Sequence, residues 1–206
     1  GVALSGMALP GDVSADGDKT DDAGALEQSA HAAFQRGEFS RAAGLYAKAL
    51  EALGGKRSPR LLKNHALALH KAERLRPAIR AYEKALEASA DDAELRFLMG
   101  MALQSQGQFA GASRAFAAVL EREPGHLKAR FELGLVALKR GRYDEAARAF
   151  EESLKRNPGN KSALQNLVKA RLEGGDQKGA LEALGQMHAQ HPADVQTLLS
   201  MAALLQ

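Results

Sequence analysis

The sequence predicts an all-helical protein, built as a stack of helix–turn–helix units. Aromatic residues make up only 5% of the chain and tryptophan is absent, so alanine and leucine, both good helix formers, must supply much of the packing. A period of 34 residues is shared by three residue types. It is seen at Pro124, Pro158 and Pro192, at Gly107, Gly141 and Gly175, and at Ala78, Ala112, Ala146 and Ala180. A fixed period of this length indicates a repeat architecture, in which each unit packs against its neighbours.

On this period the chain divides into five repeats and a final capping helix. The repeats span residues 23–56, 59–92, 93–126, 127–160 and 161–194, and the capping helix spans residues 195–206. Each repeat is expected to hold two helices joined by a tight turn. The turn position is occupied by Gly37, Glu73, Gly107, Gly141 and Gly175. Glycine there supplies the left-handed backbone conformation that ends a helix, which a side chain would penalise.

The second helix of each repeat carries a small residue followed, four positions later, by a large one. The small column is Ala42, Ala78, Ala112, Ala146 and Ala180, and the large column is Tyr46, Tyr82, Phe116, Phe150 and Leu184. The small residue lets two helices approach closely, and the large one fills the neighbouring groove. The fifth repeat is degenerate, with Gln177 and His188 at positions where apolar residues are usual, which is typical of a unit near the end of a stack.

A 34-residue helix–turn–helix unit with these columns resembles the tetratricopeptide repeat, over residues 23–206. The family's pairing of a large with a small residue in the first helix recurs at Met99-Gly100 and Leu133-Gly134, whereas its tryptophan position holds Arg96 and Arg130. The resemblance implies a right-handed α-solenoid that binds other proteins.

In this family the first helices of successive repeats line a concave groove. The resemblance assigns to that groove Phe34, Arg60, Lys63, Leu67, His70, Lys71, Phe97, Met101, Lys128, Phe131, Leu135, Lys139 and Lys169. Phe97, Met101, Phe131 and Leu135 are expected to be exposed there. Apolar side chains flanked by lysines suit a protein or peptide partner with apolar anchors and acidic neighbours. The alternative is that some of these apolar residues pack between repeats.

The residues that catalysis or metal binding needs do not come together in this sequence. The absence of cysteine excludes disulfides, thiolate zinc sites and cysteine nucleophiles. His188 and His191 have a spacing compatible with a metal, but no further ligand stands at a matching position in their repeat. We therefore expect neither an enzyme nor a bound metal or cofactor. Nucleic acid is not an expected partner, because no basic run is interleaved with aromatic residues.

Residues 1–22 are expected to lie outside the repeats. They hold five aspartates against one lysine, beside a basic remainder. A mildly apolar start is followed by Val13-Ser14-Ala15, which fits a small-residue cleavage site. The segment is interpreted as the remnant of a secretory signal or tether, or as a flexible acidic leader. A further hypothesis is that it occupies the groove of its own chain or of a neighbouring copy.

The sequence thus predicts an adaptor or scaffold that docks a partner segment in its groove. The signal-like pattern favours a periplasmic or envelope-associated location over a cytoplasmic one, within a bacterial multi-protein assembly. Two alternatives stay open, namely a self-assembling, oligomeric scaffold and the regulatory part of a larger enzyme. The prediction leaves room for a membrane-associated complex.

Overall fold

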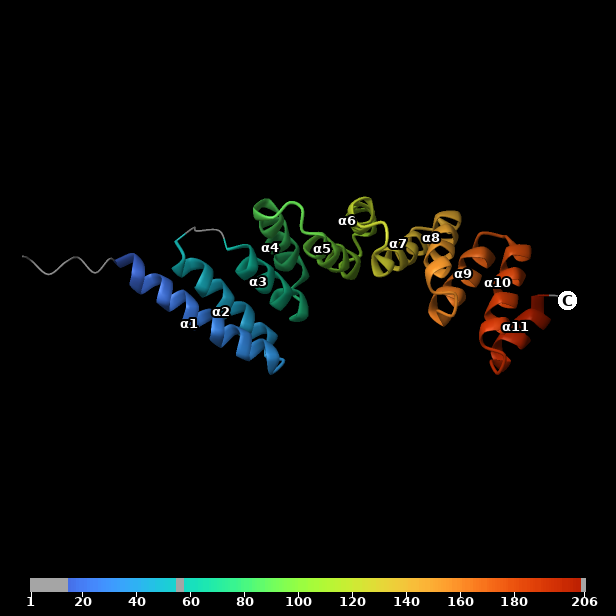
Figure 1. Ribbon diagram of the computed structural model, residues 1–206, viewed down its shortest axis with the longest axis horizontal. Coiled ribbons are helices and arrows are strands. Elements are labelled where there is room, and N and C mark those ends of the chain that lie inside the picture. The colour runs from blue at the N-terminus through green and yellow to red at the C-terminus, as the bar shows by residue number, and fades with distance from the viewer. Residues whose placement is uncertain (1–14, 55–57, 205–206) are drawn as a thin grey trace, which may run out of the picture.

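The computed structural model describes residues 15–54 and 58–204, and within them the chain is helical without strands (Figure 1). The helices are α1 (Ala15–Gln35), α2 (Phe39–Ala52), α3 (Pro59–Lys71), α4 (Leu75–Ala88), α5 (Ala93–Ser105), α6 (Phe109–Arg122), α7 (Leu127–Lys139), α8 (Tyr143–Arg156), α9 (Lys161–Glu173), α10 (Gln177–Gln190) and α11 (Val195–Leu204). The all-helical prediction is confirmed. None of these helices is both long and apolar enough to cross a membrane.

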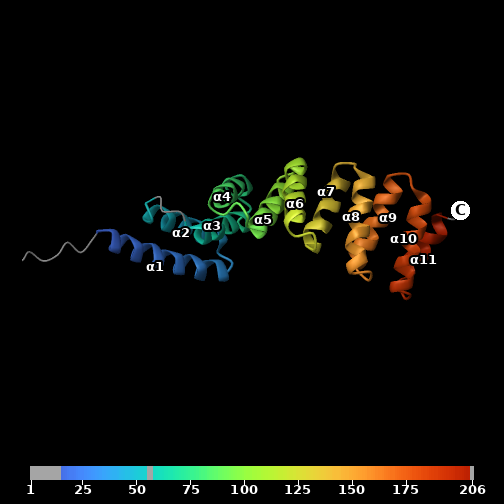
Figure 2. The same ribbon diagram turned by 45° about the horizontal axis from the view of Figure 1, so that its top comes forward.

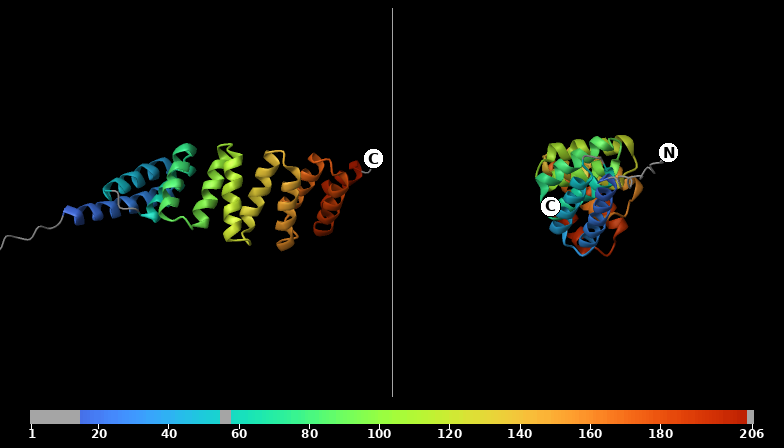
Figure 3. Two further views of the ribbon diagram at one scale, coloured as in Figure 1. Left: turned by 90° about the horizontal axis from the view of Figure 1, so that it is seen from above. Right: turned by 90° about the vertical axis from the view of Figure 1, so that its left-hand side faces the viewer.

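Consecutive helices pack against each other along the whole stack, from α1 against α2 to α10 against α11. The pairs follow one another along one long axis, with α1 at one end and α11 at the other (Figures 2 and 3). An α-solenoid of this kind has no central core. Its apolar interior instead runs along the stack between neighbouring helices.

The odd-numbered helices from α3 to α9 begin at Pro59, Ala93, Leu127 and Lys161, the first residues of the repeats read from the sequence. The residue before each of these helices caps it. Asp92, for example, accepts a hydrogen bond from the Leu95 amide at 2.9 Å, and such a cap satisfies a backbone donor that the helix leaves free. Helix α1 departs from the expectation, because it begins eight residues before the repeat boundary at residue 23. Residues 15–22 of the expected leader are therefore helical, whereas residues 1–14 lie outside the described residues.

The mid-repeat turns adopt a left-handed backbone conformation in all five repeats. Its φ angle is 78°, 77°, 68° and 80° at the four glycines and 59° at Glu73. Glutamate is strained in this conformation because its Cβ approaches the backbone too closely, at a cost of roughly 1–2 kcal/mol. The second repeat therefore carries a strain that its neighbours avoid.

We expect the substitution Glu73→Gly to raise the free energy of unfolding by about 1 kcal/mol, because relief of strain outweighs the added freedom of the unfolded chain. Urea titration followed by circular dichroism measures the change. Gly107→Glu is the matched reverse variant, since a Cβ at Gly107 would meet no other atom within 4 Å and its effect would come from the backbone alone. It should lower stability by a similar amount. Equal stability of all three proteins would contradict the expectation.

The small and large columns of the second helices form the interior. All five alanines of the small column are 0% exposed, and the large column is at most 2% exposed at any position. In the third and fourth repeats, Phe116 and Phe150 face glycines of the first helices, so that a Cβ built on Gly134 would lie only 2.7 Å from Cε1 of Phe150. In these two repeats the ring occupies the space that a first-helix side chain would otherwise take.

Candidate functional site

The predicted groove residues lie on one side of the first helices. In α3, Arg60, Lys63 and Leu67 stand on one face, because they follow the helical spacing of three and four residues. Two pairs of successive first helices also come into contact. Helix α3 contacts α5 and α7 contacts α9, whereas no pair of successive second helices packs to the same extent in the part of the chain described. We call the surface made by the thirteen predicted groove residues the first-helix face.

Polar contacts connect successive first helices across this face. Arg60 on α3 donates to Glu27 on α1 at 2.9 Å, and Lys63 on α3 pairs with Glu94 on α5. Gln104 on α5 continues the series by donating to a carboxylate oxygen of α7, at 3.0 Å. These pairs are partly exposed, so each contributes at most about 1 kcal/mol to stability. Their larger effect is on charge, because Arg60 and Lys63 are already paired with carboxylates.

The basic charge that is not paired belongs to three other residues of the face. Lys71, Lys128 and Lys139 are exposed, and none of them forms an ion pair with any described residue. Lys169 is exposed as well, with its Nζ 3.8 Å from a carboxylate oxygen of Glu173 one turn later. The lysines available to an acidic partner are therefore spread from the end of α3 to α7.

The prediction that Phe97, Met101, Phe131 and Leu135 are exposed is wrong. All four are half-buried and pack against the apolar interior, as the alternative interpretation held. The Phe97 ring centroid lies 5.6 Å from that of Phe116, and the Phe131 and Phe150 centroids are separated by the same distance. The aromatic ring of the first helix packs on the large ring of the second helix, because this contact buries both rings. Each residue still leaves part of its side chain at the surface.

The other apolar residues of the face and its histidine are also half-buried. Phe34 packs edge-on against Phe39, with ring centroids 5.1 Å apart, and Leu67 is half-buried on α3. His70 lies edge-on to Tyr82, at 6.2 Å between centroids. Burial lowers the pKa of His70, and the nearby Lys71 charge lowers it further, so the imidazole is neutral at neutral pH. His70 can therefore accept as well as donate a hydrogen bond at this surface.

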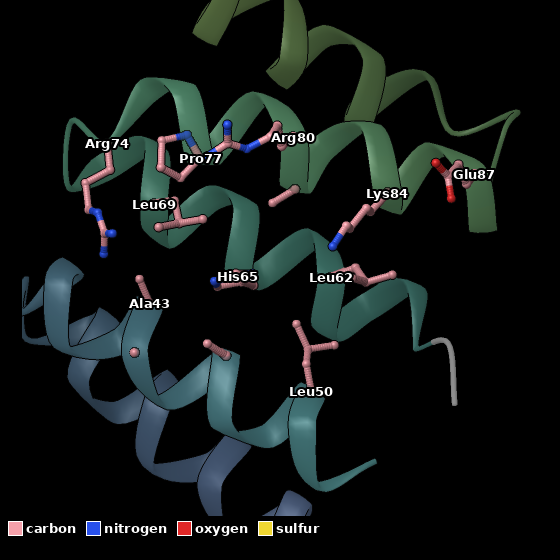
Figure 4. A pocket seen from close by; sticks show the side chains of 13 residues that line it. Ala43, Leu50, Leu62, His65, Leu69, Arg74, Pro77, Arg80, Lys84 and Glu87 are labelled. Atoms are coloured by element: carbon pink, nitrogen blue, oxygen red, sulfur yellow. The ribbon is translucent and has the colours of Figure 1, made fainter. Parts of the chain in front are cut away.

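A pocket away from the first-helix face was not predicted from the sequence. A pocket of about 720 Å³ opens between α2, α3 and α4, on the side of the second helices (Figure 4). Arg74, Arg80 and Lys84 stand around it, and His65 points into it from α3. A usable signal was present at Leu62, which lines the pocket at the repeat position where Arg96 and Arg130 stand in the next two repeats.

His191, one of the two histidines with metal-compatible spacing, contacts the backbone of the preceding repeat. Nε2 of His191 lies 3.1 Å from the carbonyl oxygen of Gly159. Among the described residues, no three histidines or carboxylates come close enough to hold a metal ion together.

The fold of this chain is similar to that of several proteins of known structure. Among solved structures, MamA has a TM-score of 0.77 at 20% identity, with 87% of this chain and 96% of that one covered. YrrB, described as a tetratricopeptide repeat (TPR) protein with an unusual peptide-binding site, has a TM-score of 0.73 at 23% identity, with 91% and 97% covered. A tetratricopeptide repeat protein from Parabacteroides merdae has a TM-score of 0.76 at 17% identity, with 89% and 72% covered. At these identities the likeness establishes the fold.

The sequence comparisons are consistent with the structural ones. No curated protein sequence matches the chain. Two models of the tetratricopeptide repeat match it, one over residues 97–161 and the other over residues 137–205. Together with the helix pairs, the 34-residue period and the neighbours in fold, these matches show that the chain belongs to the tetratricopeptide-repeat family and is a right-handed α-solenoid.

Proposed function

We propose that this protein is a non-enzymatic adaptor that binds an acidic, apolar-anchored segment of a partner protein along its first-helix face. The observation that carries the proposal is the combination of three unpaired lysines, Lys71, Lys128 and Lys139, with half-buried apolar side chains between them. The description of YrrB as a TPR protein with a peptide-binding site supports a peptide as the kind of partner.

The half-burial of the apolar residues changes how such a partner would bind. Shallow contacts on Phe97, Met101, Phe131 and Leu135 offer modest apolar area, so the partner gains a little from each repeat instead of anchoring in one deep pocket. The exposed lysines would steer acidic residues to the face and fix the register of the segment. Affinity should therefore fall with rising salt concentration, because exposed charges are screened.

One finer part of the proposal rests on the sequence alone. The place in a bacterial envelope or periplasmic assembly depends on the signal-like pattern of the first fifteen residues, most of which lie outside the described residues. The alternative is that the chain is the regulatory part of a larger enzyme, a role that the same fold is equally able to fulfil.

The test compares partner capture by two charge-reversed proteins. Lys128→Glu with Lys139→Glu should lower recovery of the partner about tenfold or more, since each reversal replaces an attraction by a repulsion. The control is Lys48→Glu with Lys178→Glu, which makes the same change of charge at exposed lysines of α2 and α10 that form no ion pair with described residues. Capture from the native cell with quantitative mass spectrometry measures recovery, and circular dichroism checks folding. Equal recovery by both double variants would refute the assignment of the face.

A self-assembling scaffold is a second candidate, favoured by one observation at the last helix. Val195, Leu198 and Leu199 of α11 are 63%, 45% and 57% exposed, which is unusual for three large apolar side chains on one short helix. Sedimentation of the chain alone at increasing concentration separates the two functions, because only a self-assembling scaffold gains mass.

A further inference from the structure

The pocket between α2, α3 and α4 lies on the opposite side of α3 from the first-helix face. Leu62, His65 and Leu69 line it from α3, and at 3.6 residues per turn they point away from Arg60, Lys63 and Leu67. The pocket is therefore a separate surface, bounded by the second helices α2 and α4. We call it the second-helix groove. This groove lies apart from the first-helix face, the surface proposed for the adaptor function.

The same place two repeats later shows why this groove is open. A hollow of about 360 Å³, half the volume, lies between α6, α7 and α8 at equivalent repeat positions. Arg130 lines it where Leu62 lines the larger groove, and its guanidinium donates to the carbonyl oxygen of Pro124 at 2.7 Å. Arg96 makes the corresponding contact with Ala90 at 2.6 Å. Leucine is shorter than arginine, so Leu62 leaves open a space that an arginine side chain partly fills.

Charge also distinguishes the second-helix groove from its counterpart. Arg74, Arg80 and Lys84 are exposed around it, and none forms an ion pair within the described residues. In the counterpart, Glu152 replaces Lys84 and Glu145 replaces Pro77, which leaves acidic and basic groups in balance. The groove is thus basic along its rim, although Glu87 stands at one end.

The interior of the groove is apolar with one neutral polar group. Ala43, Ala47, Leu50 and Ala81 line it together with the leucines of α3. His65 is half-buried among them, and burial lowers its pKa, with the charges of Arg74 and Lys84 adding to the effect. The imidazole is therefore uncharged at neutral pH and does not disturb an apolar occupant. A cavity of this volume accepts several side chains at once.

The geometry points to a partner helix with one apolar face flanked by acidic residues as the occupant of the second-helix groove. All the walls are helices, whose backbone groups are already hydrogen-bonded, so an extended peptide would find no backbone partners there. A helix satisfies its own backbone and can seat an apolar ridge between α2 and α4. Carboxylates on its flanks would then meet Arg74, Arg80 and Lys84, whose positive charge supplies the complementarity.

The test uses a synthetic, fluorescein-labelled helical peptide of about four turns, with leucine along one face and glutamate on both flanks. Fluorescence anisotropy measures its Kd for the full chain. Arg80→Glu with Lys84→Glu should raise the Kd about tenfold or more. Arg114→Glu with Arg148→Glu is the matched control, because both are exposed arginines of second helices and the change of charge is the same. This control should bind the peptide as the unmodified protein does.

A second variant separates a shaped groove from general attraction of charge. Leu62→Arg installs the residue that the next two repeats carry at this position, so it should fill the groove and raise the Kd although it adds a positive charge. Tighter binding by Leu62→Arg would overturn the proposal, as would an equal loss in the matched control. Binding of the chain to phosphatidylglycerol vesicles with no binding of the peptide would also overturn it, in favour of a lipid surface. Lys128→Glu with Lys139→Glu should leave the Kd unchanged, so the adaptor function and this groove can fail independently.

Discussion

Replacing Phe150 by alanine is expected to lower the free energy of unfolding by about 3–5 kcal/mol, the largest loss of any single substitution considered for this chain. The ring is 0% exposed, faces Gly134 of α7, and packs against Phe131 at 5.6 Å between centroids. Its removal costs the transfer of a large apolar side chain to water and leaves a cavity that stiff neighbouring helices cannot close. Thermal and urea unfolding followed by circular dichroism measure the loss.

The damage from Phe150→Ala should also be local. In a stack where each repeat contacts only its neighbours, stability is a sum of repeat and interface contributions. Hydrogen exchange should therefore increase in α7, α8 and α9, while α2 and α3 keep their protection. Phe109→Ala serves as the control, because Phe109 is half-buried at the start of α6 and its loss should cost much less. Uniform loosening of the whole chain would contradict the quasi-one-dimensional description of the fold.

Much of the fold could be predicted because each recurring column has a physical reason of its own. A left-handed turn favours glycine, a close helix contact favours alanine, and the neighbouring groove favours a large side chain such as Phe116. The start of α1 was not predicted, because the prediction depended on these recurring columns. Residues 15–22 carry none of these columns, so the period contains no information about them, although they continue the helix.

The candidate site could be predicted only in part, since it depends on how the repeats are spaced. Lys63 and Glu94 are 31 residues apart and pair because α3 and α5 lie side by side. The sequence of either repeat alone does not predict this contact. The ion pair makes Lys63 less available to a partner. The second-helix groove was not predicted because it depends on a short side chain, Leu62. A sequence motif consists of residues that are present, whereas this groove is a space that a longer side chain would fill.

The contact between Gly134 and Phe150 allows a second large effect to be predicted. Alanine is a better helix former than glycine by about 1 kcal/mol, so Gly→Ala inside an exposed helix should stabilise it. At Gly134, however, the new Cβ would lie 2.7 Å from Cε1 and 2.8 Å from Cζ of Phe150. We therefore expect Gly134→Ala to lower the free energy of unfolding by about 1–3 kcal/mol. Gly44→Ala is the matched control, because a Cβ there meets nothing within 4 Å and should raise stability.

Combining Gly134→Ala with Phe150→Ala tests whether the ring is the cause. With the ring absent, the added methyl group enters empty space and partly fills the cavity, so Gly134→Ala should become neutral or stabilising in the Phe150→Ala protein. The difference between its two effects is the interaction energy of the pair, expected at about 1–3 kcal/mol for residues in direct contact. Urea unfolding of the four proteins in the cycle measures it. If Gly134→Ala costs the same with and without the ring, the loss arises in the α7 backbone, and the close packing of glycine against ring does not hold these repeats together.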